Sequence, residues 1–295
     1  MRLRNLFFLL LCFTLLLSPG SVFAADAPAG KPRLTLSWSK NLLKIKGDYL
    51  PGGELEVWYL EAYCRDGSTT RDWGKTVIKH KTELVCANAD NTQVKLKCTL
   101  EDGVQVLHTI TAGNDEIDFK VTATNPTKQA SRAHWAQPCI RVGVFTGHTE
   151  PNDKYAYIKK SFVFIDGKLQ LMPTPVWETK ARYIPGQVWA APGVPRDDVN
   201  PRPLNPQTPS NGIIGCFSAD DKLILASVWE PYQELFQGVI RCVHSDFRIG
   251  GLKPGETKNI RGKLYLVEND LDALLTRYKK DFPEHNIVRV NIRLR

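Results

Sequence analysis

The sequence predicts an all-β protein built from antiparallel sheets, with one helix near its C-terminus. Apolar and polar residues alternate through residues 34–38, 94–100 and 117–123. Successive side chains of a strand point to opposite faces, so each of these segments has one dry face and one wet face. Half-solvated strands of this kind are typical of antiparallel sheets. The pair Asp166-Gly167, with apolar residues alternating on both sides, predicts a two-residue hairpin.

The first 24 residues have the pattern of a secretory signal peptide. Arg2 and Arg4 precede an apolar run over residues 6–17, and Val22 and Ala24 supply small residues for cleavage. The run of 12 residues is too short to span a bilayer. We therefore expect a secreted or periplasmic protein whose mature chain has no integral membrane segment.

Composition indicates a folded domain with a sizeable core. The chain is 42% hydrophobic and 24% charged, which excludes a disordered protein. Removal of the signal peptide removes two arginines and lowers the net charge from +8 to +6. This mild, dispersed charge does not favour a nucleic-acid partner. We expect one β-sandwich domain over residues 25–286, with 287–295 as a basic tail or an edge strand. The sequence does not predict an oligomeric state.

Six cysteines follow the signal peptide, and an even number in an exported chain permits three disulfides. Fifteen pairings exist, and the sequence does not choose among them. Cys86 and Cys98 flank a polar turn and are one candidate pair. Alternatively, several of the cysteines are small buried apolar residues. The six are Cys64, Cys86, Cys98, Cys139, Cys216 and Cys242.

The predicted helix begins after Asn269 or Asp270 and ends before Pro283. An apolar stripe at three- and four-residue spacing predicts that one side of it packs against a sheet. The stripe consists of Leu271, Leu274, Leu275, Tyr278 and Phe282.

Residues 172–212 contain nine of the nineteen prolines, together with Trp177 and Trp189. Proline lacks the N–H that a central strand needs, so this segment is not a run of central strands. Two tryptophans argue against a free linker. We expect a long ordered loop that lies across a sheet, and such loops are often functional.

The first candidate site lies where a strand begins, at residues 133–141. The His134 imidazole can exchange protons near neutral pH, and Trp135 can stack on a sugar ring. Gln137 and Arg141 can bind hydroxyl groups. The alternative is that His134 and Trp135 are partly buried structural residues.

The second candidate site is Glu230, between Trp229 and Pro231 and close to Tyr232. A desolvated carboxylate has a raised pKa and can act as a base near neutral pH. Pro231 is expected to end the preceding strand, which places Glu230 near the edge or the mouth of a sheet. The alternative is a surface turn with solvated acids.

The third candidate site contains His244 and Asp246, which alternation places on the same face as Cys242. His244 and Asp246 can form a hydrogen-bonded pair, or bind a metal together with His134. Scattered ligands are a weak metal signal, so a structural histidine is favoured and no metal is predicted. The chain has no nucleophile-elbow, phosphate-loop, Rossmann or zinc-protease motif, and no cofactor is predicted.

Four short motifs resemble the aldose 1-epimerase (galactose mutarotase) family, and the resemblance covers about residues 100–270. The stretch from 229 to 285 is also similar to proteins exported by planctomycete-type bacteria. The motifs are Asn-Pro-Thr-Lys at 125–128, His-Trp-Ala-Gln at 134–137, Glu-Pro-Tyr-Gln at 230–233 and Leu-Lys-Pro-Gly-Glu at 252–256.

The resemblance implies a β-supersandwich, in which two large antiparallel sheets pack together. It also implies that His134 is the general acid at the ring oxygen of a sugar and that Glu230 is the general base at its anomeric hydroxyl. Each such role supplies roughly a hundred- to ten-thousandfold in rate. The expected substrate-binding residues are Trp135, Gln137, Arg141, Trp229, His244 and Asp246.

The sequence thus favours an exported protein that binds a saccharide or acts on one, with an epimerase-like isomerase or a polysaccharide-acting domain as its enzymatic forms. Two alternatives stay open: a non-catalytic carbohydrate-binding module, and a structural or interaction protein of the cell envelope. Acid–base chemistry requires that His134, Glu230 and at least one tryptophan converge on one concave surface.

Overall fold

The computed structural model describes residues 33–286, except for residues 154, 177, 179, 184, 185 and 239. The predicted signal peptide, the predicted tail at 287–295 and Trp177 lie outside the described residues. No helix in the described part of the chain is long and apolar enough to cross a bilayer.

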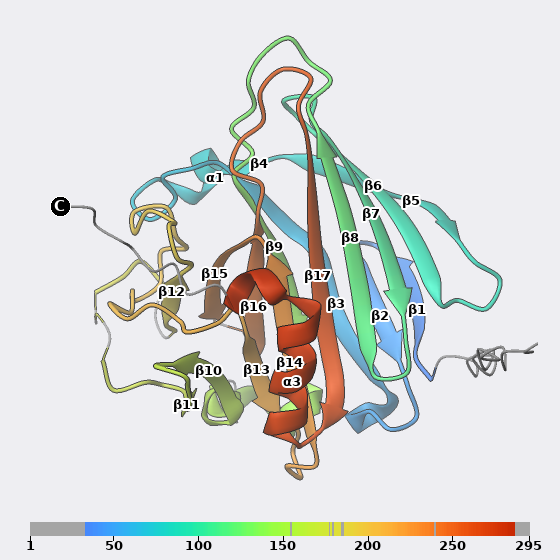
Figure 1. Ribbon diagram of the computed structural model, residues 1–295, viewed down its shortest axis with the longest axis vertical. Helices are drawn as coiled ribbons and strands as arrows, with labels where there is room; N and C mark the ends of the chain where they lie inside the picture. The colour runs from blue at the N-terminus through green and yellow to red at the C-terminus, as the bar shows by residue number, and fades with distance from the viewer. Residues whose placement is uncertain are drawn as a thin grey trace, which may run out of the picture. The chain divides into compact units, whose positions relative to one another are not determined.

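Two antiparallel sheets form the protein (Figure 1). In the described chain, sheet A has eight strands in the order β1-β2-β3-β9-β16-β15-β12, and β4 pairs with β3 outside this path. Its strands are β1 (Thr35–Ser39), β2 (Leu42–Lys46), β3 (Glu54–Cys64), β4 (Val77–Ile78), β9 (Trp135–Arg141), β12 (Val188–Ala190), β15 (Tyr232–Gln237) and β16 (Cys242–Arg248).

Sheet B has nine strands within the described ranges, in the order β11-β10-β13-β14-β17-β8-β7-β6-β5. Its strands are β5 (His80–Ala87), β6 (Gln93–Leu100), β7 (Gln105–Ala112), β8 (Glu116–Thr124), β10 (Ser161–Ile165), β11 (Lys168–Leu171), β13 (Ile214–Phe217), β14 (Leu223–Glu230) and β17 (Thr257–Glu268). The short helical turns are η1 (Pro51–Gly53), α1 (Trp73–Thr76), α2 (Gly143–Thr146), η2 (Pro151–Asp153), η3 (Ala156–Lys160) and η4 (Pro283–Asn286).

Alternation in the sequence corresponds to the two faces of the strands. Along β6, Val94, Leu96, Cys98 and Leu100 are buried while the residues between them are partly or fully exposed. The buried faces of both sheets meet in one large core. The predicted fold class, an antiparallel β-sandwich of the supersandwich type, is confirmed.

The predicted hairpin at Asp166-Gly167 joins β10 to β11. Both residues have positive φ, at 51° and 73°. A two-residue turn of this conformation matches the right-handed twist of the strands, and Asp and Gly tolerate positive φ. The local sequence therefore determines this turn.

The predicted C-terminal helix is α3 (Leu271–Asp281), which covers part of sheet B (Figure 1). The Asp270 side chain caps it by accepting a hydrogen bond from the Ala273 N–H at 2.9 Å. Leu274 and Tyr278 pack into a second apolar cluster with residues of β10 and β14. The helix thus buries the face of sheet B that points away from sheet A.

The proline-rich segment 172–212 lies against sheet A. Within it, β12 pairs with β15 at the edge of the sheet, and Trp189 is completely buried. Asp198 and Asn200 are also buried and make hydrogen bonds to other parts of the chain. These contacts hold the described part of the segment in place.

None of the six cysteines in the described chain forms a disulfide. The suggested Cys86–Cys98 bridge is wrong, because Cys86 lies opposite Lys95 and Cys98 lies opposite Thr82 in the β5–β6 pair. Five of the six are buried, as the alternative interpretation expected, and Cys86 is exposed.

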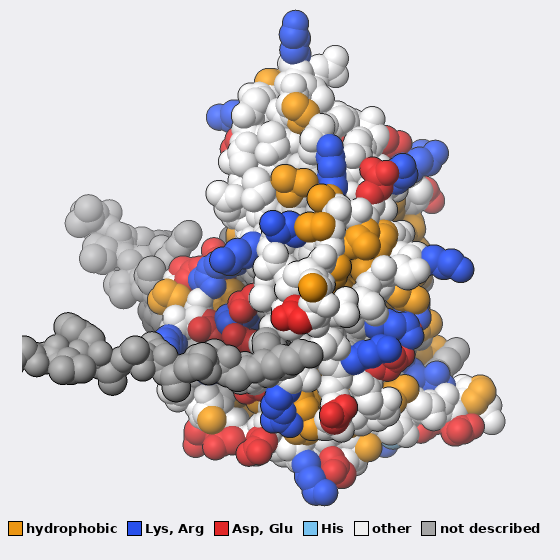
Figure 2. Space-filling model, turned by 90° about the vertical axis from the view of Figure 1, so that its right-hand side faces the viewer, with side chains coloured by type: hydrophobic (Ala, Val, Ile, Leu, Met, Phe, Trp, Pro, Cys, Tyr) orange, Lys and Arg blue, Asp and Glu red, His pale blue; other side chains and the backbone are white. Residues whose placement is uncertain are grey.

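On the face shown in Figure 2, basic and acidic side chains are interspersed.

Candidate functional site

The outer face of sheet A, which points away from sheet B, collects most of the predicted site residues. Arg141 of β9 lies opposite Cys242 of β16, and Trp135 lies opposite Arg248. Alternation therefore places every second residue of the two strands on this face. Its members are Trp135, Gln137, Cys139, Arg141, Cys242, His244, Asp246 and Arg248.

Two carboxyl groups lie side by side on this face, on neighbouring strands. Glu234 of β15 is opposite Asp246 of β16, and both are fully buried. Burial raises the pKa of Glu234 to about 8 and raises the pKa of Asp246 well above its usual range. The pair therefore carries a proton at neutral pH.

Gln137 connects this face to β3 and to the proline-rich segment. Its amide nitrogen donates to Glu61 Oε2 at 2.9 Å, and its amide oxygen accepts from Asn200 Nδ2 at 3.4 Å. The Asn200 backbone N–H also donates to Glu234 Oε2 at 2.8 Å. Asn200 thus joins the segment to two strands of sheet A.

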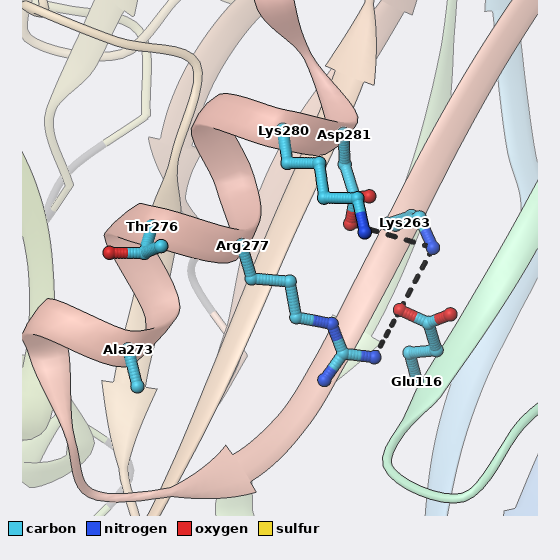
Figure 3. A pocket seen from close by; sticks show the side chains of 7 residues that line it. All are labelled: Glu116, Lys263, Ala273, Thr276, Arg277, Lys280 and Asp281. Carbon is cyan, nitrogen blue, oxygen red and sulfur yellow. Dashed lines mark hydrogen bonds and ion pairs between the residues drawn. The ribbon is translucent and has the colours of Figure 1, made fainter.

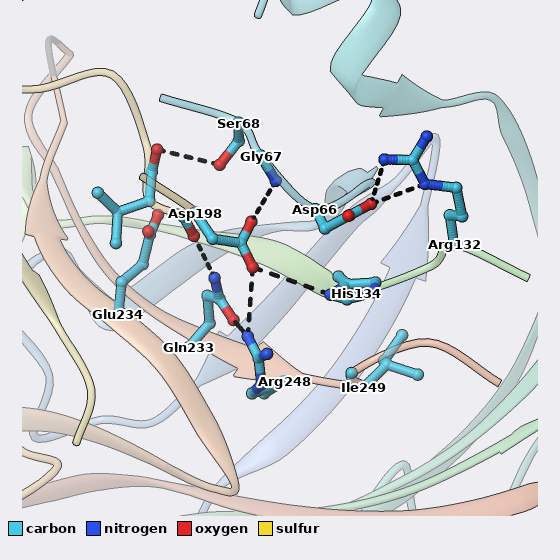
Figure 4. Close-up of polar contacts among 12 residues, drawn as sticks. Asp66, Gly67, Ser68, Arg132, His134, Asp198, Gln233, Glu234, Arg248 and Ile249 are labelled. Atoms are coloured by element: carbon cyan, nitrogen blue, oxygen red, sulfur yellow. Dashed lines mark hydrogen bonds and ion pairs between the residues drawn. The ribbon is translucent and has the colours of Figure 1, made fainter. Parts of the chain in front are cut away.

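His134 lies at one end of the same face, beside Asp198 of the proline-rich segment (Figure 4). Asp198 Oδ2 is 3.8 Å from His134 Nδ1 and 3.5 Å from an Arg248 guanidinium nitrogen. Asp198 Oδ1 accepts a hydrogen bond from the Gly67 N–H at 2.9 Å. Gln233 contacts both the backbone of Asp198 and Arg248. This network holds Asp198 beside His134, whose Nδ1 has no hydrogen-bond partner among the described residues.

Several buried polar atoms of this face have no hydrogen-bond partner in the described part of the chain. Most buried polar groups in proteins are paired with protein or with ordered water. A group of unpaired atoms indicates ordered water, an ion or a ligand. The atoms are Trp135 Nε1, Arg141 Nε, Asn200 Oδ1, Arg202 Nε and Nη1, Glu234 Oε1, His244 Nδ1 and both carboxylate oxygens of Asp246.

An open pocket of about 860 Å³ adjoins the other end of this face. Protein ligand pockets have typical volumes of roughly 300–1,000 Å³. We call it the sheet A pocket. It is lined by Gly52, Glu54, Leu55, Glu56, Arg141, Gly143, Val144, Phe145, Thr149, Pro151, Ile240 and Arg241.

Both charged and apolar groups line the sheet A pocket. An Arg141 guanidinium nitrogen lies 3.3 Å from Glu56 Oε2, and the Nε atoms of Arg141 and Arg241 are buried without a partner among the described residues. Val144 and Ile240 are about half exposed beside them. The pocket therefore offers hydrogen-bonding groups next to apolar surface.

A second pocket, of about 630 Å³, lies between α3 and β17 (Figure 3). Its charged groups contact each other: Lys263 is 2.8 Å from Glu116 and 3.6 Å from Asp281, and Arg277 also contacts Glu116. These ion pairs link the helix to sheet B. We therefore infer that the charged groups of this pocket stabilise the fold.

The structure does not bring Glu230 and His134 together. Trp229 points into the core, so Glu230, the next residue of β14, points to the opposite side, which α3 covers. There Glu230 Oε2 lies 2.5 Å from His285 Nε2, and His285 Nδ1 lies 2.7 Å from the Tyr278 hydroxyl. The predicted acid and base thus belong to separate networks, which is a correction to the acid–base hypothesis.

Pro231 explains this separation. As predicted, it ends β14, and it is the one residue between that strand of sheet B and β15 of sheet A. Residues before and after it in the same motif therefore face different sides of the sandwich.

The two predicted tryptophan platforms are both buried. Trp229 packs between the sheets, with ring centroids 4.7 Å from Phe247 and 5.1 Å from Phe119. This position leaves no ring face for a sugar, so Trp229 is a packing residue. Trp135 is fully buried on the outer face of sheet A, and its ring centroid lies 6.4 Å from that of Trp73.

His244 and Asp246 lie on the same face, but Nδ1 and Oδ1 are 3.8 Å apart, which is too far for the suggested hydrogen bond. His134 is not part of this group, because its carbonyl pairs with the N–H groups of Ile249 and Gly250, beyond the far end of β16. Cys139 instead approaches His244.

Sequence reasoning missed several polar residues of this face. Glu61 of β3 and Glu234 of β15 are placed on this face by strand pairing, which a single sequence does not show. The other missed residues are Asp198, Asn200, Arg202 and Arg248.

No protein-family model matches this sequence, and no curated protein matches it. Among solved structures, the chain is similar to a putative aldose 1-epimerase from Escherichia coli K12, at 8% identity and a TM-score of 0.42, over 80% of this chain and 99% of that one. It is similar to a putative mutarotase from Salmonella typhimurium, at 11% identity and a TM-score of 0.37, over 81% and 95%. It is also similar to an α-mannosidase from Enterococcus faecalis V583, at 9% identity and a TM-score of 0.44, over 85% and 30%. Two of these three structures are named as a putative aldose 1-epimerase and a putative mutarotase, the family that the sequence motifs also resemble.

Proposed function

We propose that this protein is an exported carbohydrate-binding protein whose saccharide ligand occupies the sheet A pocket. The pocket itself carries the proposal: it combines two carboxylates and two guanidinium groups with apolar side chains in one open volume. Sugar hydroxyls both donate and accept hydrogen bonds, and sugar C–H faces pack on apolar groups. The signal-peptide pattern supports a secreted or periplasmic location.

The charges of the pocket favour a neutral, polyhydroxylated ligand. Glu54 and Glu56 would repel an anion, while Arg141 and Arg241 would repel a cation. A neutral sugar can donate to the carboxylates and accept from the unpaired Nε–H groups of both arginines. Val144 and Ile240 supply the apolar contact.

Binding is better supported than catalysis. A hydrogen bond from Lys44 lowers the pKa of Glu54, so Glu54 is a carboxylate at neutral pH and suits hydroxyl recognition rather than acid catalysis. Glu234, whose pKa is raised to about 8, lies opposite Asp246 and away from the residues that line the pocket. An epimerase would also need His134 and Glu230 in one place.

The test is calorimetric titration of the purified protein with a panel of neutral oligosaccharides. We expect Glu56→Gln and Arg241→Ala to weaken binding by about 5- to 100-fold, because each removes a hydrogen bond to a charged group. Glu83→Gln is the matched control, since Glu83 is exposed on β5 and pairs with Lys81 outside the pocket. We expect it to bind like the wild type.

Two results would contradict the proposal. One is the absence of binding to every saccharide in the panel, and the other is equal loss in Glu56→Gln and Glu83→Gln. Circular dichroism of each variant shows whether it is folded.

A further inference from the structure

Three metal-ligating side chains converge on the outer face of sheet A: Cys139, Cys242 and His244. The sulfur atoms and a His244 ring nitrogen all lie within 4.8 Å of one another. The β9–β16 register creates the group, because it brings Cys139 next to His244 while Cys242 and His244 share one face of β16. All three residues are buried.

We propose that these residues bind one zinc ion through Cys139 Sγ, Cys242 Sγ and His244 Nε2. Zinc binds Cys and His at about 2.3 and 2.0–2.1 Å with tetrahedral geometry, which places ligand atoms roughly 3.5–3.8 Å apart. Cys242 Sγ and His244 Nε2 are 3.2 Å apart. Three protein ligands leave a fourth position for water or another ligand.

The surroundings of His244 suit a zinc ligand. Its Nδ1 lies 3.8 Å from Asp246 Oδ1, and its ring stacks on Phe236 with centroids 4.1 Å apart. A zinc-bound histidine usually donates its other ring N–H to a carboxylate, which fixes the tautomer. At 3.8 Å the two atoms are beyond hydrogen-bond distance, and in the proposed site Asp246 is the carboxyl group placed to accept this N–H once zinc is bound.

The charges of the proposed site also balance. The thiolate is the form that binds metals. Two thiolates balance the two charges of zinc, and buried charges require such pairing.

Gly238 leaves room beside the sulfur atom of Cys242. A Cβ at this position would lie 2.1 Å from Cys242 Sγ and 3.2 Å from His244 Nε2. The Tyr157 hydroxyl holds this part of the backbone by donating to the carbonyls of Gly238 at 2.7 Å and Cys242 at 3.2 Å. Because Gly238 has no side chain, the space beside the ligand atoms stays free.

The experiment uses the full mature protein, purified with its thiols reduced, stripped with a chelator and titrated with Zn²⁺ against a chromophoric competitor. We expect one zinc per chain, and thiolate-to-cobalt charge-transfer absorption when Co²⁺ replaces zinc. Cys242→Ser and Cys139→Ser should weaken zinc binding at least 100-fold. Asp246→Asn should weaken it about 10- to 100-fold.

Cys216→Ser is the matched control, because Cys216 is an equally buried, unpaired cysteine on β13 of sheet B. It should bind zinc like the wild type. The proposal is overturned if the reduced wild-type protein binds no stoichiometric zinc, if cobalt gives no thiolate absorption, or if Cys216→Ser and Cys242→Ser lose zinc equally. The cobalt spectrum requires no variant, so an unfolded variant does not prevent a decision.

Discussion

At the residue scale, His108 shows how burial in this sandwich determines the protonation of a side chain. Its ring nitrogens lie 2.8 Å from the Tyr59 hydroxyl and 2.9 Å from the Tyr63 hydroxyl. Burial lowers the pKa of His108 to about 3, while an unfolded histidine titrates near 6.5. The imidazole is therefore neutral in the folded protein at neutral pH.

This depressed pKa predicts a loss of stability in acid. Between pH of about 6.5 and 3 the unfolded chain binds a proton at His108 that the folded chain does not, so the free energy of unfolding falls as pH falls. The slope contributed is up to about 1.4 kcal/mol per pH unit. Urea unfolding at several pH values measures it.

His108→Gln should remove this contribution, while His148→Gln serves as a control, because His148 is partly exposed beside Asp153. An identical pH dependence in wild type and His108→Gln would show that His108 does not titrate between the folded and unfolded states as argued.

At the element scale, α3 is held both by apolar packing and by ion pairs. Leu274 is buried against sheet B, and Arg277, which lines the pocket in Figure 3, lies 2.8 Å from Asp115. We predict that Leu274→Ala destabilises the protein by about 2–5 kcal/mol, because it leaves a cavity. Thr276→Ala, on the exposed side of the same helix, should change stability by less than about 0.5 kcal/mol. Urea unfolding of the two variants compares them, and equal effects would contradict the packing argument.

The elements that the sequence predicts well are those with local causes. The alternation of β6, the Asp166-Gly167 turn and the Asp270 cap of α3 each depend on neighbouring residues. The candidate site depends on distant ones: Arg141 meets Glu56 and Cys242 only because β9 lies between β3 and β16. The pairing of β9 with β3 and β16 cannot be predicted from a single sequence.

The Glu230 motif is a second case in which the sequence does not determine the position of a side chain. Glu230 and Gln233 are three residues apart, and a motif in sequence suggests one site. Pro231 instead passes the chain from sheet B to sheet A, so Glu230 meets His285 while Gln233 meets Asp198. The sequence predicted where the strand ends, but the side on which Glu230 lies depends on the packing of the sheets and α3.

At the scale of the whole molecule, the two sheets and the segment 172–212 differ in how they are held. The centre of sheet B is bonded along the full length of β17 on both sides, whereas the described part of the segment pairs with sheet A through the short strand β12 and through side-chain hydrogen bonds such as Gly67–Asp198 and Asn200–Glu234. Proteins open locally where such contacts are few. We therefore expect the segment to open without unfolding of the sandwich.

Hydrogen exchange monitored by mass spectrometry tests this difference. Asp198→Ala removes the acceptor of the Gly67 N–H and the partner of Arg248. Exchange of the amides around Gly67 and Asn200 should speed up by about 5- to 100-fold, because a buried hydrogen bond to a charged group is lost. Amides of β17 should exchange as in the wild type, since they open only by global unfolding. Equal acceleration in β17 would instead mean that the segment and the two sheets form one cooperative unit, in which Asp198 stabilises the entire sandwich.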